Sequence, residues 1–143
     1  MSRGPLHNLS AEIPLELLDA DERLRLYGRW AMHRHKKQRC GSAEGDYHVP
    51  PNDDDREPRE MILGPDAAMV CQRALARVPG RERIVLAILY IPHRLPAAAQ
   101  MRILGIPPRT SQERHLLGLK LWANWWRILD EDAHLTRSRI RAA

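Results

Sequence analysis

The sequence predicts an all-α protein, a helical domain with a C-terminal helix-turn-helix and a long polar loop. Five stretches place apolar residues three or four positions apart, which is the spacing of one face of a helix. Proline or glycine lies near the ends of these stretches, as expected where helices begin and end. We find no internal repeat and no convincing strand.

Length and charge limit the classes of function that this chain can have. Its 143 residues suit one domain with a modest core rather than two independently stable domains. Lysine and arginine number 23 against 18 acidic residues, a formal net charge of +5, which favours a polyanionic partner such as DNA, RNA or a membrane surface. No apolar run is long enough to span a membrane or to act as a secretory signal, so we expect a cytoplasmic protein without a membrane partner.

The N-terminal part divides into three segments by composition. Residues 1–13 contain prolines and a glycine and are expected to form a flexible N-terminus. Residues 14–40 are expected to form a basic helix, and residues 41–64 a polar loop or linker, because glycines and prolines replace aliphatic side chains there. The apolar residues of the predicted helix are Leu15, Leu18, Leu24, Tyr27 and Trp30.

Residues 65–130 are expected to form the helix-turn-helix domain, and residues 131–143 a polar, basic tail. One helix begins near Asp66 and stops at Pro79, and a second ends at Pro92. A short helix follows, which Gly105 closes as a left-handed cap. This short helix is expected to turn Ala99, Ile103 and Leu104 inward.

The last helix is expected to run from about Pro108 to about Leu129 and to have two different halves. Proline suits the first helical position, and Ile106 is expected to fill the core beneath the turn. Polar residues of the first turns are candidates for base or phosphate contacts in a DNA major groove: Arg109, Thr110, Gln112, Glu113 and Arg114. The predicted core-facing stripe is Leu116, Leu117, Leu121, Trp122, Trp125 and Ile128, with Trp122 and Trp125 buried together.

Two observations keep a structural alternative open. Consecutive helices joined by a glycine turn also occur in all-α domains that never touch nucleic acid. In addition, Ser111 occupies a position where most helix-turn-helix sequences have a buried valine or isoleucine.

The segment before the polar loop is a second candidate for nucleic-acid contacts. Lys36, Lys37 and Arg39 could neutralise phosphates, and the alternative is a solvated basic end of a helix. No metal site is expected, because a His-x-His pair on a helix points its rings apart and there is no close cysteine pair. The residues considered for zinc are His33, His35, Cys40, His48 and Cys71, and Cys71 is interpreted as a small buried apolar residue.

No catalytic residue or cofactor site is predicted. The sequence contains no glycine-rich phosphate loop, no nucleophile elbow and no paired acids on a clear scaffold. The acidic run Asp53 to Asp55 is interpreted as part of a solvated loop rather than as a magnesium site. We therefore expect that the protein is not an enzyme.

The sequence from "RERIVLAILYI" through "LPAAAQMRILGIPPRTSQERHLLGLKLWANWW" resembles the part of sigma factors that recognises the promoter −35 element. More closely, it resembles the bacteriophage late-gene antitermination proteins of the Q type, to which "LYGRWAMHRHKKQ" and "GSAEGDYHVPP" are also similar. The resemblance covers roughly residues 24 to 129.

The resemblance implies binding to double-stranded DNA near a late promoter and loading onto bacterial RNA polymerase that still holds sigma factor. Proteins of this family then travel with polymerase and suppress pausing and termination, in at least one branch by narrowing the RNA exit channel. The expected function is therefore antitermination in the cytoplasm of a bacterial host cell, with nascent RNA as a further candidate partner. The alternatives are a promoter-binding repressor or activator and a protein-interaction module without a DNA role.

Overall fold

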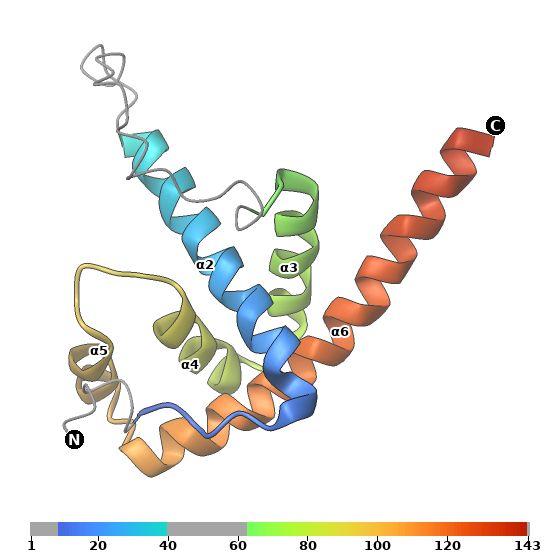
Figure 1. Cartoon of the computed structure of the whole chain (residues 1–143). Coiled ribbons are helices and arrows are strands. Elements are labelled where there is room, and N and C mark those ends of the chain that lie inside the picture. The colour runs from blue at the N-terminus through green and yellow to red at the C-terminus, as the bar shows by residue number, and fades with distance from the viewer. Residues whose placement is uncertain (1–8, 40–62, 143) are drawn as a thin grey trace.

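The computed structural model describes residues 9–39 and 63–142, and the regular elements within these ranges are all helices (Figure 1). The all-α prediction is therefore confirmed for this part of the chain. A short 3-10 turn, η1, precedes five α-helices. Their bounds are η1 Leu15–Leu17, α2 Leu18–Arg39, α3 Pro65–Arg77, α4 Gly80–Tyr90, α5 Ala97–Leu104 and α6 Pro108–Ala142.

Prolines mark the starts of four of these helices. Pro65 and Pro108 are the first residues of α3 and α6, where a missing N–H costs no intrahelical hydrogen bond. Pro79 and Pro96 stand immediately before α4 and α5. The segmentation expected from proline positions agrees with the helix order of the structure.

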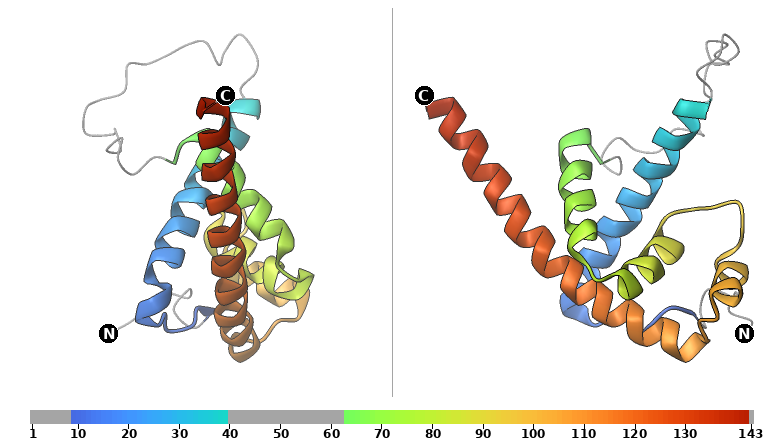
Figure 2. Two further views of the ribbon diagram at one scale, coloured as in Figure 1. Left: turned by 90° about the vertical axis from the view of Figure 1, so that its right-hand side faces the viewer. Right: turned by 180° about the vertical axis from the view of Figure 1, so that it is seen from behind.

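The long helix α6 is the scaffold of the fold. It has 35 residues, which corresponds to about 52 Å, and its main neighbours are α3 and α4. In Figures 1 and 2, α2 and α6 diverge with α3 between them, and the C-terminal part of α6 extends beyond the other helices. The residues of that projecting part are mostly exposed from Glu131 onward.

The main core lies where α2, α3, α4 and α6 meet. Trp122 at its centre is fully buried, and its indole Nε1 donates a hydrogen bond to the Cys71 carbonyl oxygen at 3.2 Å. Burial raises the pKa of the Cys71 thiol to about 12, which agrees with its interpretation as a small apolar residue. Other fully buried members of this core are Leu24, Ala68, Ala74, Leu86 and Leu119.

The buried face of α6 is rotated relative to the predicted stripe. Leu117 and Ile128 are exposed, whereas Leu119 and Ala123 are buried. The close approach of α4 explains this rotation, because a Cβ on Gly118 would lie 3.0 Å from the Cβ of Glu82 and 3.2 Å from the Cγ of Leu86. The glycine side of α6 therefore faces α4.

The tryptophan arrangement also differs from the expectation in one respect. Trp122 stacks on Trp126, with ring centroids 6.0 Å apart, and not on Trp125. Trp125 is only half-buried, and the Arg77 guanidinium lies 5.1 Å from its ring centroid. At about 100° per residue, side chains four positions apart on a helix differ in direction by about 40°, whereas side chains three positions apart differ by about 60°. Trp126 is therefore closer in direction to Trp122 than Trp125 is.

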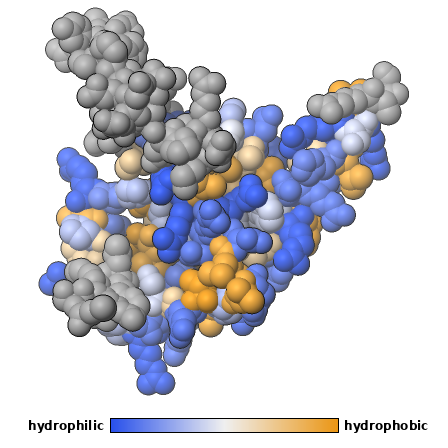
Figure 3. Space-filling view, viewed as in Figure 1, coloured by the Kyte–Doolittle hydropathy of each residue, from blue (hydrophilic) through white to orange (hydrophobic). Residues whose placement is uncertain are grey.

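Three further expectations about the ends of the chain are wrong. Residues 9–13, assigned to a flexible N-terminus, pack against the helices; we call this segment the N-terminal strap. At the start of the N-terminal helix, Leu15 is 82% exposed and Leu18 is exposed, because η1 changes the register and turns Leu17 and Ala20 inward. Figure 3 shows apolar surface amid hydrophilic surface on this side of the molecule.

The predicted polar tail is instead a continuation of α6, which is helical to Ala142. The segment "DEDAHLTRSRIRAA" has no proline or glycine to end the helix. Within it the His134 Nε2 lies 3.6 Å from the Asp130 Oδ2, one turn apart. Of the loop predicted for residues 41–64, residues 41–62 lie outside the described ranges.

In α5 the predicted direction of the apolar residues is also wrong. Met101 is buried, whereas Ile103 is 72% exposed and Leu104 is exposed. Apolar character alone did not indicate the inward face, because this eight-residue helix has few residues of any other kind. The left-handed cap at Gly105 is confirmed by its φ of 69°.

The backbones of α2 and α4 approach each other closely at Gly28, so one methyl group added at this residue should have a large effect on stability. A Cβ on Gly28 would overlap the Tyr90 carbonyl oxygen, whereas a Cβ on Gly64 would meet nothing within 4 Å. We expect Gly28→Ala to lower the free energy of unfolding by more than about 4 kcal/mol, since α2 and α4 must separate. Gly64→Ala should change it by less than about 1 kcal/mol, because the added methyl group meets nothing and only the N-cap preference of α3 for glycine over alanine is lost. Urea unfolding of both variants checks this, and equal stability would contradict the packing of α2 on α4.

Candidate nucleic-acid interface and its buried support

A three-residue turn joins α5 to α6. Gly105 supplies the left-handed residue, and the Ile106 N–H donates to the Met101 carbonyl oxygen at 2.9 Å, which closes the end of α5. Ile106 is half-buried against the small cluster formed by Leu9, Val85 and Met101. The turn therefore fixes where α6 begins relative to α5, as the sequence suggested for Ile106.

The first two turns of α6 hold all five candidate recognition residues. The Arg109 side chain is 92% exposed, and its Nε lies 3.7 Å from the Glu113 Oε1, whose side chain is also exposed. Thr110, Gln112 and Arg114 are half-buried. The candidates therefore share one short stretch of helix, and Arg109 and Glu113 project farthest into solvent.

A long part of the sequence before Glu113 contains no acidic residue. No acidic residue occurs from Ile84 to Gln112, whereas exposed Arg94 and Arg102 lie between them. The candidates predicted from the sequence omit these two arginines, although a run without acidic residues in a chain with 18 of them indicates a positively charged region. They add positive charge to the α5 side of the turn.

The opposite face of the same two turns holds the N-terminal strap. Ser111 is fully buried, and its Oγ donates a hydrogen bond to the Leu9 carbonyl oxygen at 2.7 Å. The Leu9 side chain packs with Val85 and Met101. This hydrogen bond explains why a serine occupies a position where a branched apolar residue was expected, because a valine would leave the carbonyl without its partner.

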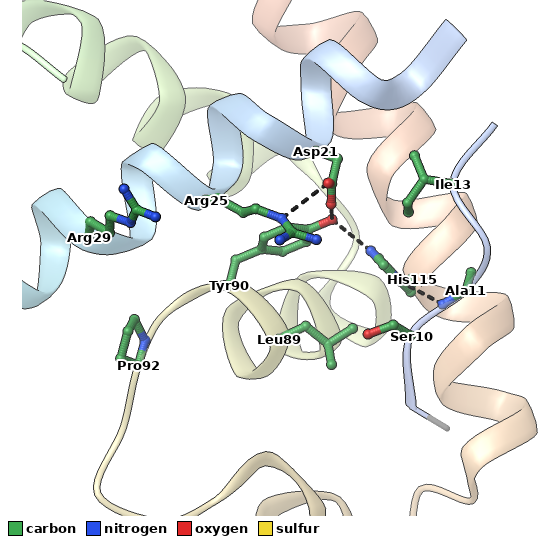
Figure 4. Close-up of a pocket in the computed structure, with 10 residues that line it drawn as sticks. All are labelled: Ser10, Ala11, Ile13, Asp21, Arg25, Arg29, Leu89, Tyr90, Pro92 and His115. Atoms are coloured by element: carbon green, nitrogen blue, oxygen red, sulfur yellow. Dashed lines mark hydrogen bonds and ion pairs between the residues drawn. The ribbon is translucent and has the colours of Figure 1, made fainter. Parts of the chain in front are cut away.

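A buried chain of hydrogen bonds continues from the strap through α6 and α4 to α2 (Figure 4). The Ala11 N–H donates to His115 Nδ1 at 3.0 Å, and His115 Nε2 lies 2.7 Å from the Tyr90 hydroxyl oxygen. That hydroxyl donates to the Asp21 Oδ1 at 2.5 Å. Because the Nδ1 accepts and the tyrosine proton points to Asp21, the His115 proton must sit on Nε2 in a neutral ring.

Electrostatics favour this neutral state of His115. Burial lowers the pKa of His115 to about 4, with Arg25 adding to the decrease and the Asp21 carboxylate opposing it. Burial, the hydrogen bond to Asp21 and its charge raise the pKa of the Tyr90 hydroxyl well above its ordinary value. The Arg25 Nε lies 3.1 Å from the Asp21 Oδ2 and completes the pairing of that carboxylate.

The second candidate segment is only partly visible. Lys36, Lys37 and Arg39 lie in α2, but their side chains are outside the described part of the structure. One turn earlier, the guanidinium of Arg34 lies 5.2 Å from the Trp30 ring centroid. In Figure 1 the C-terminal end of α2, which carries this segment, and the start of α6 lie at different ends of the molecule.

The residues considered for zinc do not form a cluster in the described ranges. His33 is exposed on α2, whereas Cys71 is buried in α3. Cys40 and His48 lie outside the described residues, as does the side chain of His35. Within residues 9–39 and 63–142 no group of three or more histidine, cysteine or acidic side chains could hold a metal ion.

Comparisons with protein families, with curated proteins and with solved structures found no match to this chain. Among the described helices, none is long and apolar enough to cross a membrane.

The lowered pKa of His115 predicts acid destabilisation with a defined pH window. An unfolded histidine binds a proton near pH 6.5, whereas the folded ring resists it until about pH 4. The unfolded state therefore holds more protons between these values, and the free energy of unfolding should fall by about 3 kcal/mol as the pH decreases across them. Urea titrations from pH 7 to pH 4 measure this decrease.

His115→Gln is the matched variant for this prediction. A glutamine amide can accept from Ala11 and donate to Tyr90, but it does not titrate. We expect this variant to lose most of the pH dependence between pH 6.5 and pH 4 that the parent shows. An unchanged slope in His115→Gln would show that His115 is not the titrating group.

Proposed function

We propose that this protein is a phage-type transcription antitermination factor that binds double-stranded DNA near a promoter and loads onto bacterial RNA polymerase. The observation that supports DNA binding best is the two-sided start of α6. Arg109 and Glu113 project into solvent on one side, while Ser111 and His115 are hydrogen-bonded to the strap on the other. A helix held in this way can present polar side chains to a groove without losing its support.

In this proposal α5 and α6 act as a helix-turn-helix, with the first turns of α6 in the major groove. The guanidinium of Arg109 suits a guanine edge, the Gln112 amide an adenine edge, and the Glu113 carboxylate a cytosine amino group. Thr110 and Arg114 are assigned to phosphates or bases near the rim of the groove. The ion pair with Glu113 orients the Arg109 side chain before DNA binds.

The antitermination part of the proposal is supported by the sequence resemblance. It requires a second interface besides the DNA-binding one, because the protein must stay with polymerase after the promoter is left. The helix α2 and the projecting C-terminal end of α6 lie away from the turn between α5 and α6 and are the candidates for contacts with polymerase or sigma factor. Lys36, Lys37 and Arg39 are proposed as auxiliary contacts to DNA or nascent RNA. The bacterial host cytoplasm is the proposed location.

The DNA-binding proposal predicts a specific effect of one exposed arginine. Arg109→Ala should weaken binding to the specific site by about 1–3 kcal/mol and relax the preference at one base pair, because a bidentate contact to a base is lost. Fluorescence anisotropy with fragments of the protein's own promoter region measures this. Arg73→Ala, an exposed arginine on α3, is the matched control and should bind like the parent. Equal affinity of Arg109→Ala and the parent for every fragment would contradict the proposed recognition helix.

The antitermination proposal predicts readthrough at a distance from the promoter. On a template with the protein's own promoter and a distant terminator, the full-length chain should increase the fraction of transcripts that pass the terminator, whereas Arg109→Ala should increase it less. Single-round transcription with purified polymerase and sigma factor separates initiation from termination. If the protein lowers initiation and leaves termination efficiency unchanged, it acts as a promoter-binding repressor instead.

A further inference from the structure

The C-terminal part of α6 extends beyond the other described helices (Figures 1 and 2). Of residues 131–140, all have exposed side chains except Ala133, which is half-buried. A helix end that stays in water is expected to be polar on every side. This one is not, because Leu135 is 54% exposed and Ile140 is 71% exposed.

One face of this helix end combines apolar and charged side chains at regular spacing. We call it the outer seam, and its members, at intervals of four, three and four positions, are Ile128, Asp132, Leu135 and Arg139. At about 100° per residue they lie within about 60° of one another, which is the spacing of a coiled-coil seam. All four are exposed. Trp126, which packs on the core, precedes Ile128 by two positions and therefore points about 160° away.

The two charges of the outer seam have opposite signs. Asp132 and Arg139 are seven residues apart, which is about 10 Å along the helix axis. Within residues 9–39 and 63–142 neither of them forms an ion pair. Glu131 and Arg137 continue the same order, with acidic residues first and basic residues after Leu135.

This order makes the outer seam complementary to itself in one orientation. If a two-fold axis crosses the helix near Leu135, Asp132 of each copy lies beside Arg139 of the other copy, and the two Leu135 side chains meet at the axis. A parallel pair would place like charges together at both positions, which is unfavourable. The antiparallel orientation also places the other helices of the two copies at opposite ends of the paired segment.

We propose that the outer seam of α6 binds a second copy of this chain and forms an antiparallel two-helix dimer around Leu135, with two symmetric ion pairs between Asp132 and Arg139. The contact is short compared with stable specific interfaces, which bury about 1,200–2,000 Å². The dimer is therefore reversible, with a dissociation constant in the micromolar range.

The proposed dimer does not depend on DNA binding, because the candidate recognition residues lie at the other end of α6. It also leaves the opposite face of the helix end accessible. That face carries Asp130, His134 and Arg137, which point away from the outer seam. Polymerase or sigma factor could still contact this polar face in the dimer.

Sedimentation equilibrium of the full-length chain at increasing concentration, without DNA or polymerase, tests this proposal. We expect a monomer–dimer equilibrium. Asp132→Arg and Arg139→Asp should each raise the dissociation constant about tenfold or more, because two like-charged pairs replace two opposite ones. Arg73→Asp on α3 is exposed and changes the net charge as Arg139→Asp does, so it is the matched control and should dimerise like the parent.

The double variant Asp132→Arg/Arg139→Asp tests the orientation. It exchanges the two charges, so an antiparallel dimer should recover the affinity of the parent, and far-UV circular dichroism checks that each variant keeps its helices. A monomer at every concentration, single variants that dimerise like the parent, or a double variant that stays as weak as the single ones would overturn the proposal. A monomer whose Leu135 methyl signals shift only when polymerase is added would assign the outer seam to polymerase instead.

Discussion

The hydrogen-bonded chain from Ala11 through His115 and Tyr90 to Asp21 joins the strap, α6, α4 and α2, each of which contributes one member. All three side chains are buried, so loss of one member would remove a hydrogen-bond partner from its neighbour in a region of low dielectric. The geometry also depends on Gly28, because the α4 backbone at Tyr90 approaches α2 at this glycine. One residue of α4 thus contributes its carbonyl group to the helix contact and its hydroxyl group to the buried chain.

This constraint explains how the first two turns of α6 can have a buried, hydrogen-bonded face and an exposed, charged face. Ser111 and His115 are four residues apart and share the inner face, while Arg109 and Glu113 are also four apart and lie about 200° away. The inner pair fixes the position of the helix through the strap. The outer pair is left free of the core, which makes it available to a partner. A recognition helix needs this combination of rigid support and exposed polar groups.

The sequence was sufficient to predict the features that depend on local chemistry. Prolines at the helix starts and Gly105 at the end of α5 act through their own backbone geometry, so their effect is visible in a single sequence. Directions of side chains were harder to predict. Ile103 was expected to face inward and is exposed, and the buried face of α6 was displaced by the contact of Gly118 with Leu86 on a different helix.

The buried support of the candidate interface was not predicted, since it rests on pairs that are far apart in the chain. Ser111 and Leu9 are separated by 102 positions, and Tyr90 and Asp21 by 69. From composition, Leu9 was assigned to a flexible N-terminus, and nothing in the sequence indicated the partners of Ser111, Tyr90 or Asp21. A weak signal was present, because Ser111 and His115 are polar residues four apart on a helix that must be partly buried. The pairing partners themselves could not be identified without the fold.

The proposed DNA binding requires the outer face at the start of α6 to contact the duplex while its inner face stays attached to the strap. NMR spectra of the full-length chain that cover the backbone amides and the histidine rings, recorded with and without a duplex from its promoter region, measure both faces. The expected result is large amide shifts from Arg109 to Arg114 and at Arg102, with the Ala11 amide and His115 ring signals unchanged. Shifts confined to other helices, or a loss of the Ala11 to His115 hydrogen bond when DNA binds, would contradict it.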